Sequence, residues 1–373
     1  MTWPRLSVVT LWAWTALATA GFAADEAWDD CKGVVPDQSI AGCTEVLRRG
    51  FGEPPATRAL AFYNRGLAYA DKADWDKAIA DFSAALRLNP NYAEAFYSRG
   101  NAFTERGDWN RAVADYSAAL RLNPDYIEAF NNRGNAYFNK ADLDRAIADY
   151  NEVLRLNPAY AEGFNNRGNA HFKKGDWDRA IADYGDAIRL KPDDTEAFYN
   201  RGLAHFRKGD ADSAIADYGT AIRLNPNEPE TYYNRGLAYF RKGDWDKAIA
   251  DYGEAVRLNP DYAEAFYNRG LAYFSKGSRG LAYFLKGDLD RSVADYSEAI
   301  RLNPDYAEAF YNRGLAHFRR GDWDKAIADY STAIRLNPND PEPFYNRGLA
   351  YARKGDQDKA NADYAQASRL KTR

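Results

Sequence analysis

A motif of 34 residues recurs through most of the chain, and this period constrains the fold more than any other feature of the sequence. A fixed period of this size marks units that stack on their neighbours, because one unit cannot bury its apolar face alone. The 373 residues therefore predict one stacked array rather than two or three separate domains. Nine copies begin at residues 59, 93, 127, 161, 195, 229, 263, 307 and 341.

Each copy has the pattern of two amphipathic helices. In residues 93–126, apolar or small residues at positions 4, 8 and 11 of the copy fall on one helical stripe, and those at positions 17, 20, 24 and 27 fall on a second. Gly107 suits the left-handed residue that closes the first helix, Asp108 suits the N-cap of the second, and Pro124 ends it. The predicted fold class is therefore all-α, built from stacked helix-turn-helix units.

The residue types at fixed positions carry a family resemblance. Phe at position 4, Gly at 8, an aromatic residue at 11, Ala at 20, Tyr at 24, Ala at 27 and Pro at 32 recur in nearly every copy, and this pattern resembles the tetratricopeptide repeat family. The resemblance covers residues 59–373 and implies a right-handed α-solenoid of nine units.

One departure from the family pattern is systematic. Every copy has Arg at position 7, where the family usually has Leu, and every copy has Asp at position 23. Both positions lie at the edge of an apolar stripe. We expect the Arg and Asp to pair across the two helices of a unit, with a solvated charged face as the alternative.

The seventh copy is ten residues longer than the others, because residues 269–278 are repeated almost unchanged as residues 279–288. Ten residues are about 2.8 helical turns, so a lengthened helix would not keep one apolar stripe in register. We expect an extruded segment or a break in the solenoid here. An accidental duplication is the favoured origin, and a functional insertion is the alternative.

The N-terminal residues have the pattern of an export signal. Residues 1–23 contain one cation, Arg5, an uncharged run over residues 6–20 and small residues before the expected cleavage site. The run is short for a membrane span, which needs about 20 residues, although a retained anchor is the alternative reading. We expect a protein that is exported to the periplasm or secreted.

Cys31 and Cys43 are the only cysteines, and they lie twelve positions apart. In an oxidising compartment such a pair favours a disulfide over two unpaired thiols. Residues 24–58 are therefore expected to form a shortened capping unit that this bond staples. At the other end, Asn361 and Ser368 replace the apolar residues of earlier copies, so we expect no further repeat to pack on the last helix.

Composition argues against catalysis and against nucleic-acid binding. The chain has 50 Lys and Arg against 54 Asp and Glu, whereas a phosphate-binding protein is usually basic. Phosphate-loop, nucleophile-elbow and zinc-helix motifs are missing from the sequence. We expect no enzyme activity, cofactor or metal, and the three histidines at position 11 (His171, His205 and His317) are interpreted as packing residues.

The first helices carry the candidate binding residues. The family resemblance implies that positions 2, 5, 6, 9, 12 and 13 of each copy face a concave groove. Position 6 is Asn in eight of nine copies, and a carboxamide offers a peptide backbone both a donor and an acceptor. This pattern resembles the repeat domain of O-linked N-acetylglucosamine transferase, and the alternative is that the Asn was merely copied with the unit. The candidate residues are Asn132, Asn166, Asn200, Asn234, Asn268, Asn312, Tyr199, Tyr233, Phe206 and Phe240.

These observations favour a non-catalytic protein-protein interaction scaffold. Its partner is expected to be an extended peptide or a helix that lies in the groove. A carbohydrate-binding protein of cell-envelope assembly is the alternative, because Tyr and Phe side chains also stack on sugar rings.

Overall fold

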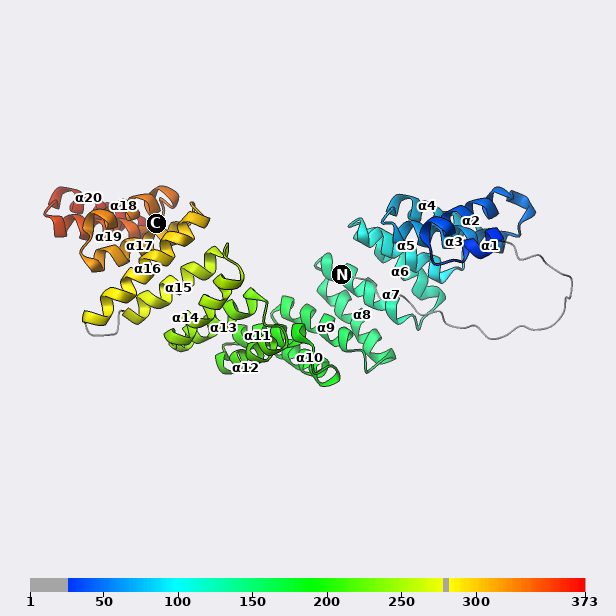
Figure 1. Ribbon diagram of the computed structural model, residues 1–373, viewed down its shortest axis with the longest axis horizontal. Helices are drawn as coiled ribbons and strands as arrows, with labels where there is room; N and C mark the ends of the chain where they lie inside the picture. The colour runs from blue at the N-terminus through cyan, green and yellow to red at the C-terminus, as the bar shows by residue number, and fades with distance from the viewer. Residues whose placement is uncertain (1–25, 278–281, 373) are drawn as a thin grey trace. The chain divides into compact units, whose positions relative to one another are not determined.

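The computed structural model describes residues 26–277 and 282–372, and every regular element in this part of the chain is helical (Figure 1). The signal peptide expected at residues 1–23 lies outside the described residues. The chain divides into two compact units, Met1–Lys140 and Ala141–Arg373. The all-α fold predicted from the repeat is confirmed.

In the first unit each helix packs on the next in chain order, beginning with the short pair α1 and α2. A single 3-10 turn at Gly50–Gly52 connects this pair to the repeats. The helices are α1 (Glu26–Cys31), α2 (Pro36–Arg48), α3 (Pro55–Asp71), α4 (Trp75–Leu88), α5 (Ala93–Glu105), α6 (Trp109–Leu122) and α7 (Ile127–Asn139).

The second unit continues the same antiparallel stacking, and the first helices of successive repeats also touch one another. Its helices are α8 (Leu143–Leu156), α9 (Ala161–Lys174), α10 (Trp177–Leu190), α11 (Thr195–Lys208), α12 (Ala211–Leu224), α13 (Pro229–Lys242), α14 (Trp245–Leu258), α15 (Ala263–Gly277), α16 (Ala282–Leu302), α17 (Ala307–Arg320), α18 (Trp323–Leu336), α19 (Pro341–Lys354) and α20 (Gln357–Lys371).

The turns and the helix contacts follow from the residues at fixed positions. Gly107 adopts the left-handed conformation at φ 71°, and the side chain of Asp108 accepts the backbone N–H of Arg111 at 3.1 Å as an N-cap. Within a helix pair, Gly236 lies against the fully buried ring of Tyr252, where a Cβ atom would stand only 2.8 Å from a ring carbon. Glycine at position 8 therefore lets the two backbones approach.

The predicted pairing of Arg at position 7 with Asp at position 23 is confirmed, so these residues are not a solvated face. Arg235 binds Asp251 in a bidentate manner, with Nε–Oδ2 at 2.8 Å and Nη2–Oδ1 at 2.7 Å, and Asp251 is only 5% exposed. The same contact joins Arg65–Asp81, Arg99–Asp115, Arg167–Asp183, Arg201–Asp217, Arg269–Asp295, Arg313–Asp329 and Arg347–Asp363.

Some of these arginines also donate to the preceding repeat. Their acceptor is the side chain at position 25 of that repeat, which lies on its second helix. Nη1 of Arg99 donates to the hydroxyl of Ser83 at 2.8 Å, and Arg347 donates to Ser331 at 2.9 Å. Three consecutive repeats of the second unit instead have glycine at this position, namely Gly185, Gly219 and Gly253.

We expect Gly219→Ser to stabilise the second unit by about 1 kcal/mol, because serine is the better helix former and would supply the missing acceptor. A Cβ atom at Gly219 has no neighbour nearer than Nη1 of Arg235 at 3.7 Å, so the side chain fits. Gly219→Ala is the matched control, because it gains helix propensity without an acceptor. Urea denaturation followed by far-ultraviolet circular dichroism would contradict the interpretation if both variants gained equally.

An extruded segment or a break in the solenoid was expected at the duplicated decamer, whose first residues, 279–281, lie outside the described residues. The helix α16 has 21 residues, against 14 for α14, and it packs on both α15 and α17 (Figure 1). Leu289 is buried with Phe274 and Ala316, and Arg269 still binds Asp295 across a 26-residue separation. The expected break in the solenoid is therefore wrong for the described residues. A helix can lengthen at its N-terminal end without shifting the stripe that follows Leu289.

The predicted cysteine pair is present at the start of the array. Cys31 of α1 and Cys43 of α2 form a disulfide, and both side chains are fully buried beside Val46 and Ala61. Asn361 and Ser368 on α20 are both exposed. The disulfide therefore ties α1 to a cluster that includes Ala61 of the first repeat.

Candidate functional site

The open face of the first helices is a stripe opposite their buried side. On α13, Thr231, Gly236 and Ala238 are buried in the helix pair, whereas Glu230 and Arg241 are exposed. Residues four or seven positions apart lie on one helical face, so positions 2, 6, 9 and 13 of each first helix share the open stripe. This stripe carries most of the candidate residues predicted from the sequence.

Five of the asparagines at position 6 donate a hydrogen bond to a tyrosine of the preceding repeat. Nδ2 of Asn234 donates to the hydroxyl oxygen of Tyr199 at 3.0 Å and to the backbone carbonyl of Glu230 at 2.8 Å. Asn268 repeats both contacts, with Tyr233 and Glu264. The same bond to tyrosine joins Asn132 to Tyr97, Asn312 to Tyr267 and Asn346 to Tyr311. We call these tyrosine and asparagine residues the Tyr-Asn ladder.

Sequence reasoning placed Tyr199 and Tyr233 on the open face but did not find this bond. A detectable signal exists, because tyrosine at position 5 and asparagine at position 6 of the next copy are separated by 35 residues in several repeats. The bond uses the amide N–H groups of asparagine. Among the described residues, Oδ1 of Asn234 and the O–H proton of Tyr199 have no hydrogen-bond partner.

A second arrangement occurs where position 9 is asparagine. Oδ1 of Asn169 accepts a hydrogen bond from the Tyr184 hydroxyl at 2.7 Å and one from Nδ2 of Asn200 at 3.3 Å. In the first unit, Asn101 likewise accepts from Tyr116 and Asn132. Asn166 occupies the same open-face position on α9 and is partly buried.

Four buried tyrosine hydroxyls lack this partner because position 9 is leucine in their repeats. Burial raises the pKa of each of these phenols, as expected for a hydroxyl removed from water. Within the part of the chain that the structure describes, they have no hydrogen-bond partner; they belong to Tyr218, Tyr252, Tyr296 and Tyr330.

We expect Tyr252→Phe to be neutral or to stabilise the protein by up to about 1 kcal/mol, because it removes a buried polar group that has no partner. Tyr184→Phe is the matched variant. It should cost about 1 kcal/mol, because it breaks the bond to Asn169. Equal losses of stability in chemical denaturation would show that the hydroxyl of Tyr252 is satisfied in solution.

The aromatic candidates take part in intramolecular contacts that cover part of each ring. The ring centroid of Tyr233 lies 5.8 Å from that of Tyr252 and 5.0 Å from that of Tyr262. Phe240 meets Trp245 edge-on at 5.0 Å. The guanidinium of Arg241 lies 5.4 Å from the centroid of Phe206 and donates to its carbonyl at 3.0 Å. All four candidate aromatic residues, Tyr199, Tyr233, Phe206 and Phe240, keep part of their surface exposed.

The position-11 histidines lie between the two helices of their repeats. His171 and His317 are buried, and burial lowers the pKa of both imidazoles. Nε2 of His317 lies 4.0 Å from the carboxylate of Asp329, which already binds Arg313. No group of three or more His, Cys, Asp or Glu residues in the described ranges could hold a metal ion.

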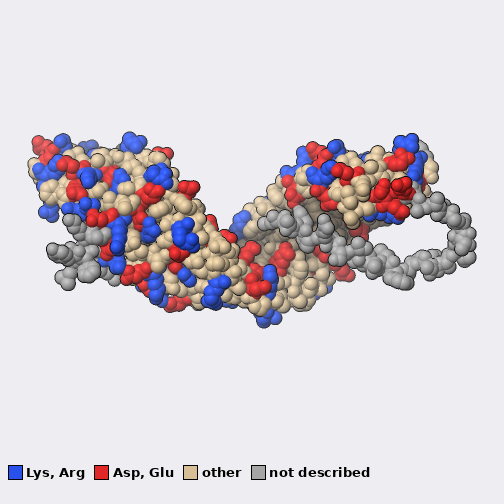
Figure 2. Space-filling view, in the orientation of Figure 1, with Lys and Arg blue, Asp and Glu red and all other residues tan. Residues whose placement is uncertain are grey.

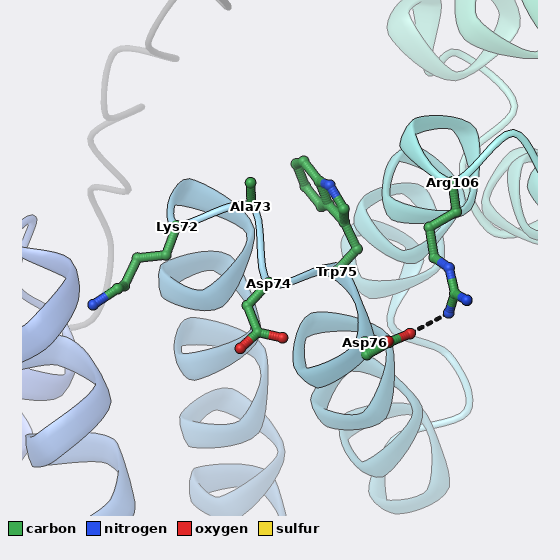
Figure 3. Close-up of a pocket in the computed structure, with 6 residues that line it drawn as sticks. All are labelled: Lys72, Ala73, Asp74, Trp75, Asp76 and Arg106. Atoms are coloured by element: carbon green, nitrogen blue, oxygen red, sulfur yellow. Dashed lines mark hydrogen bonds and ion pairs between the residues drawn. The ribbon is translucent and has the colours of Figure 1, made fainter.

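A shallow depression of about 400 Å³ opens between the turn after α3 and the end of α5 in the first unit (Figure 3). Its charged groups are already used, because Arg106 pairs with Asp76 and Lys72 pairs with Asp37. Asp74, which also lines the depression, pairs with Lys77. The lining residues are Lys72, Ala73, Asp74, Trp75, Asp76 and Arg106.

The charged residues of the visible face are mixed by sign. On the face shown in Figure 2, cations and anions are interspersed over each unit rather than gathered by sign. No described helix combines the length and the low polarity that a membrane span requires.

Comparison with known proteins identifies the family. The TPR repeat pattern matches residues 66–104, 100–141, 140–175, 168–209, 206–243, 236–277, 280–321 and 315–355, and the tetratricopeptide repeat pattern matches residues 341–372. The chain belongs to the tetratricopeptide repeat family. As a member of that family, it is a protein-protein interaction scaffold.

The fold is shared with solved structures of TM-score 0.50 or more. The C-terminal part of a TPR protein from Cytophaga hutchinsonii is 17% identical and has a TM-score of 0.57, and the match covers 67% of this chain and 98% of that one. A tetratricopeptide repeat protein from Parabacteroides merdae is 19% identical with a TM-score of 0.50, covering 69% and 98%. The protein MamA is 31% identical with a TM-score of 0.42, covering 46% and 94%. No curated protein sequence matches the chain.

Proposed function

We propose that the second unit binds an extended polypeptide along the open face of its first helices. The observation that supports this proposal is the polarity of the Tyr-Asn ladder. Because Tyr199 accepts from Asn234, its own O–H can still donate, and Oδ1 of Asn234 can still accept. A peptide bond offers the complementary pair, one carbonyl and one N–H.

The apolar neighbours of the ladder favour a polypeptide over a fully polar ligand. Leu203 and Leu237 at position 9, with Phe206 and Phe240 at position 12, are partly exposed beside the ladder. Apolar side chains of a bound segment would be buried against these residues. We propose that this binding is non-catalytic. A carbohydrate ligand is the second candidate, because the exposed parts of the tyrosine rings could also stack on sugars.

We further propose that the protein is exported. The buried disulfide between Cys31 and Cys43 favours an oxidising compartment, and the composition of residues 1–23 is that of a secretory leader. The periplasm or the extracellular space would meet this requirement.

The test compares wild type with the triple variant Asn234→Ala, Asn268→Ala and Asn312→Ala. Fluorescein-labelled neutral peptides of about 12 residues and chitin oligosaccharides serve as probes, and each lost contact should weaken peptide binding by about 0.5–1.5 kcal/mol. The melting temperature should fall modestly, since the ladder bonds are lost too.

The variant Tyr199→Phe, Tyr233→Phe and Tyr267→Phe is the control for this stability change. It breaks the bonds to Asn234, Asn268 and Asn312 but keeps Oδ1 of each asparagine. Peptide affinity should fall in both variants, because the tyrosine variant loses the donating O–H and the asparagine variant loses the accepting Oδ1. Unchanged peptide affinity in both variants would refute the ladder as the binding surface, and binding of the oligosaccharides alone would favour the second candidate.

A further inference from the structure

The second unit has two rows of carboxylates at helix N-termini, and only one row is paired. Asp178, Asp212 and Asp246 lie in the first turns of α10, α12 and α14, and each forms an ion pair with a lysine of the next first helix. Arg320 and Lys354 continue the pattern with Asp290 and Asp324. The second row, at position 2 of the first helices, is unpaired. Glu196, Glu230, Glu264 and Glu308 are exposed and have no ion-pair partner within the described ranges.

The helix dipole explains why both rows are acidic but not why one is unpaired, because it favours a carboxylate in the first turn of any helix. The unpaired glutamates share their surroundings with the Tyr-Asn ladder. Burial and the neighbouring carboxylate of Glu230 raise the pKa of Tyr199, and Asn234 binds both the Tyr199 hydroxyl and the backbone of Glu230. Glu230 lies four residues before Asn234 on the open stripe of α13, so a hydroxyl, a carboxamide and a carboxylate share one repeat boundary.

This arrangement recurs at the next two boundaries. Burial, with a smaller contribution from Glu264, raises the pKa of Tyr233 to about 12, and burial with Glu308 raises that of Tyr267. Both tyrosines accept from an asparagine of the following repeat. We call these three sets together the acidic track. The first set is Tyr199, Glu230 and Asn234, the second is Tyr233, Glu264 and Asn268, and the third is Tyr267, Glu308 and Asn312.

Resting on the peptide-binding function proposed above, we propose that the acidic track binds lysine side chains of an extended basic polypeptide. Each set offers oxygen acceptors from a carboxylate, a carboxamide and a hydroxyl. A lysine ammonium carries three donors and no acceptor. Both amide hydrogens of Asn234 are already donated, so only its Oδ1 can face the ligand.

In the last repeat, the glutamate at position 2 forms an ion pair with a lysine of the same chain. Nζ of Lys371 on α20 lies 3.1 Å from the carboxylate of Glu342, the position-2 residue of the last repeat. The same ammonium lies 5.8 Å from the ring centroid of Tyr345. The position-2 glutamate of the last repeat therefore binds an ammonium group of its own chain.

The other end of each first helix bears the opposite charge, which restricts how a partner lies. Arg207, Arg241 and Arg319 are exposed at position 13, eleven residues from position 2 and therefore about 16 Å away along the helix. A segment with lysines on one side would place them on the acidic track and turn its neutral or acidic side chains toward the arginines. A segment basic on both sides would be repelled at one edge.

The test uses three labelled peptides of about 12 residues, in which serine alternates with lysine, glutamine or glutamate, at low and high salt. The lysine peptide should bind wild type about tenfold more tightly than the glutamine peptide, and about 0.3 M salt should abolish the difference. The variant Glu230→Gln, Glu264→Gln and Glu308→Gln should lose this tenfold preference.

The matched control is Asp178→Asn, Asp212→Asn and Asp246→Asn, which removes the same charge from the paired row. It should keep the preference for the lysine peptide. If both triple variants lost the preference for the lysine peptide equally, the acidic track would be overturned, because net charge alone would explain the effect. Tight binding of the glutamine peptide with no lysine preference would overturn the track and leave the proposed peptide groove standing. If none of the three peptides binds, the proposed function fails as well.

Discussion

Replacing Arg235 with Met is expected to destabilise the second unit by about 3–5 kcal/mol, because the substitution leaves a buried carboxylate without its cation. Asp251 is 5% exposed, and both of its oxygens accept hydrogen bonds from Arg235. Chemical denaturation followed by circular dichroism measures the loss. The double variant with Asp251→Leu should recover most of the stability, because an apolar pair removes the lone charge.

The loss in Arg235→Met should also depend on pH. Burial already raises the pKa of Asp251 against the pull of Arg235, and removing the arginine should raise this pKa further. A carboxyl whose folded pKa exceeds its unfolded value is penalised as the pH rises through the folded pKa. The difference in free energy of unfolding between wild type and Arg235→Met should therefore be smaller near pH 5 than near pH 7. A double variant no more stable than Arg235→Met would contradict the buried-charge explanation.

Removing the disulfide with Cys31→Ser and Cys43→Ser is expected to cost about 2–3 kcal/mol, because the bond closes a short loop in the unfolded chain. The effect should be local to the first unit. The side chains of both cysteines lie in a cluster with Val46 and Ala61, so α1 and α2 should loosen before the later repeats. Hydrogen exchange read peptide by peptide measures this order.

Two results would contradict the local role of the disulfide. Exchange that increases equally in α2 and α18 would mean that the bond stabilises the whole array. Two reactive thiols in the denatured, unreduced exported protein would mean that the bond does not form in the cell. The variant Gly219→Ser reports on the stability of the second unit. The free energy of unfolding that it gains should be the same with and without the disulfide.

The residues within one repeat were predictable because they depend on helical periodicity. The stripes at 4, 8 and 11 and at 17, 20, 24 and 27 place the helices, and position 7 faces position 23 in a pair of that geometry. The left-handed Gly107, the N-cap at Asp108 and the Arg235–Asp251 pair all followed from such short-range spacing. Local backbone geometry determines these contacts almost completely.

Contacts between repeats were decided by the tertiary structure. The bond from Asn234 to Tyr199 and the difference between the Asp178 and Glu230 rows both depend on how one helix pair is rotated and shifted on the next. The length of α16, 21 residues, was also not predicted from the periodicity. Periodicity determines which face of a helix is buried. It carries no information on the offset between neighbouring pairs, and that offset decides which polar groups of the open face are used internally and which can meet a partner.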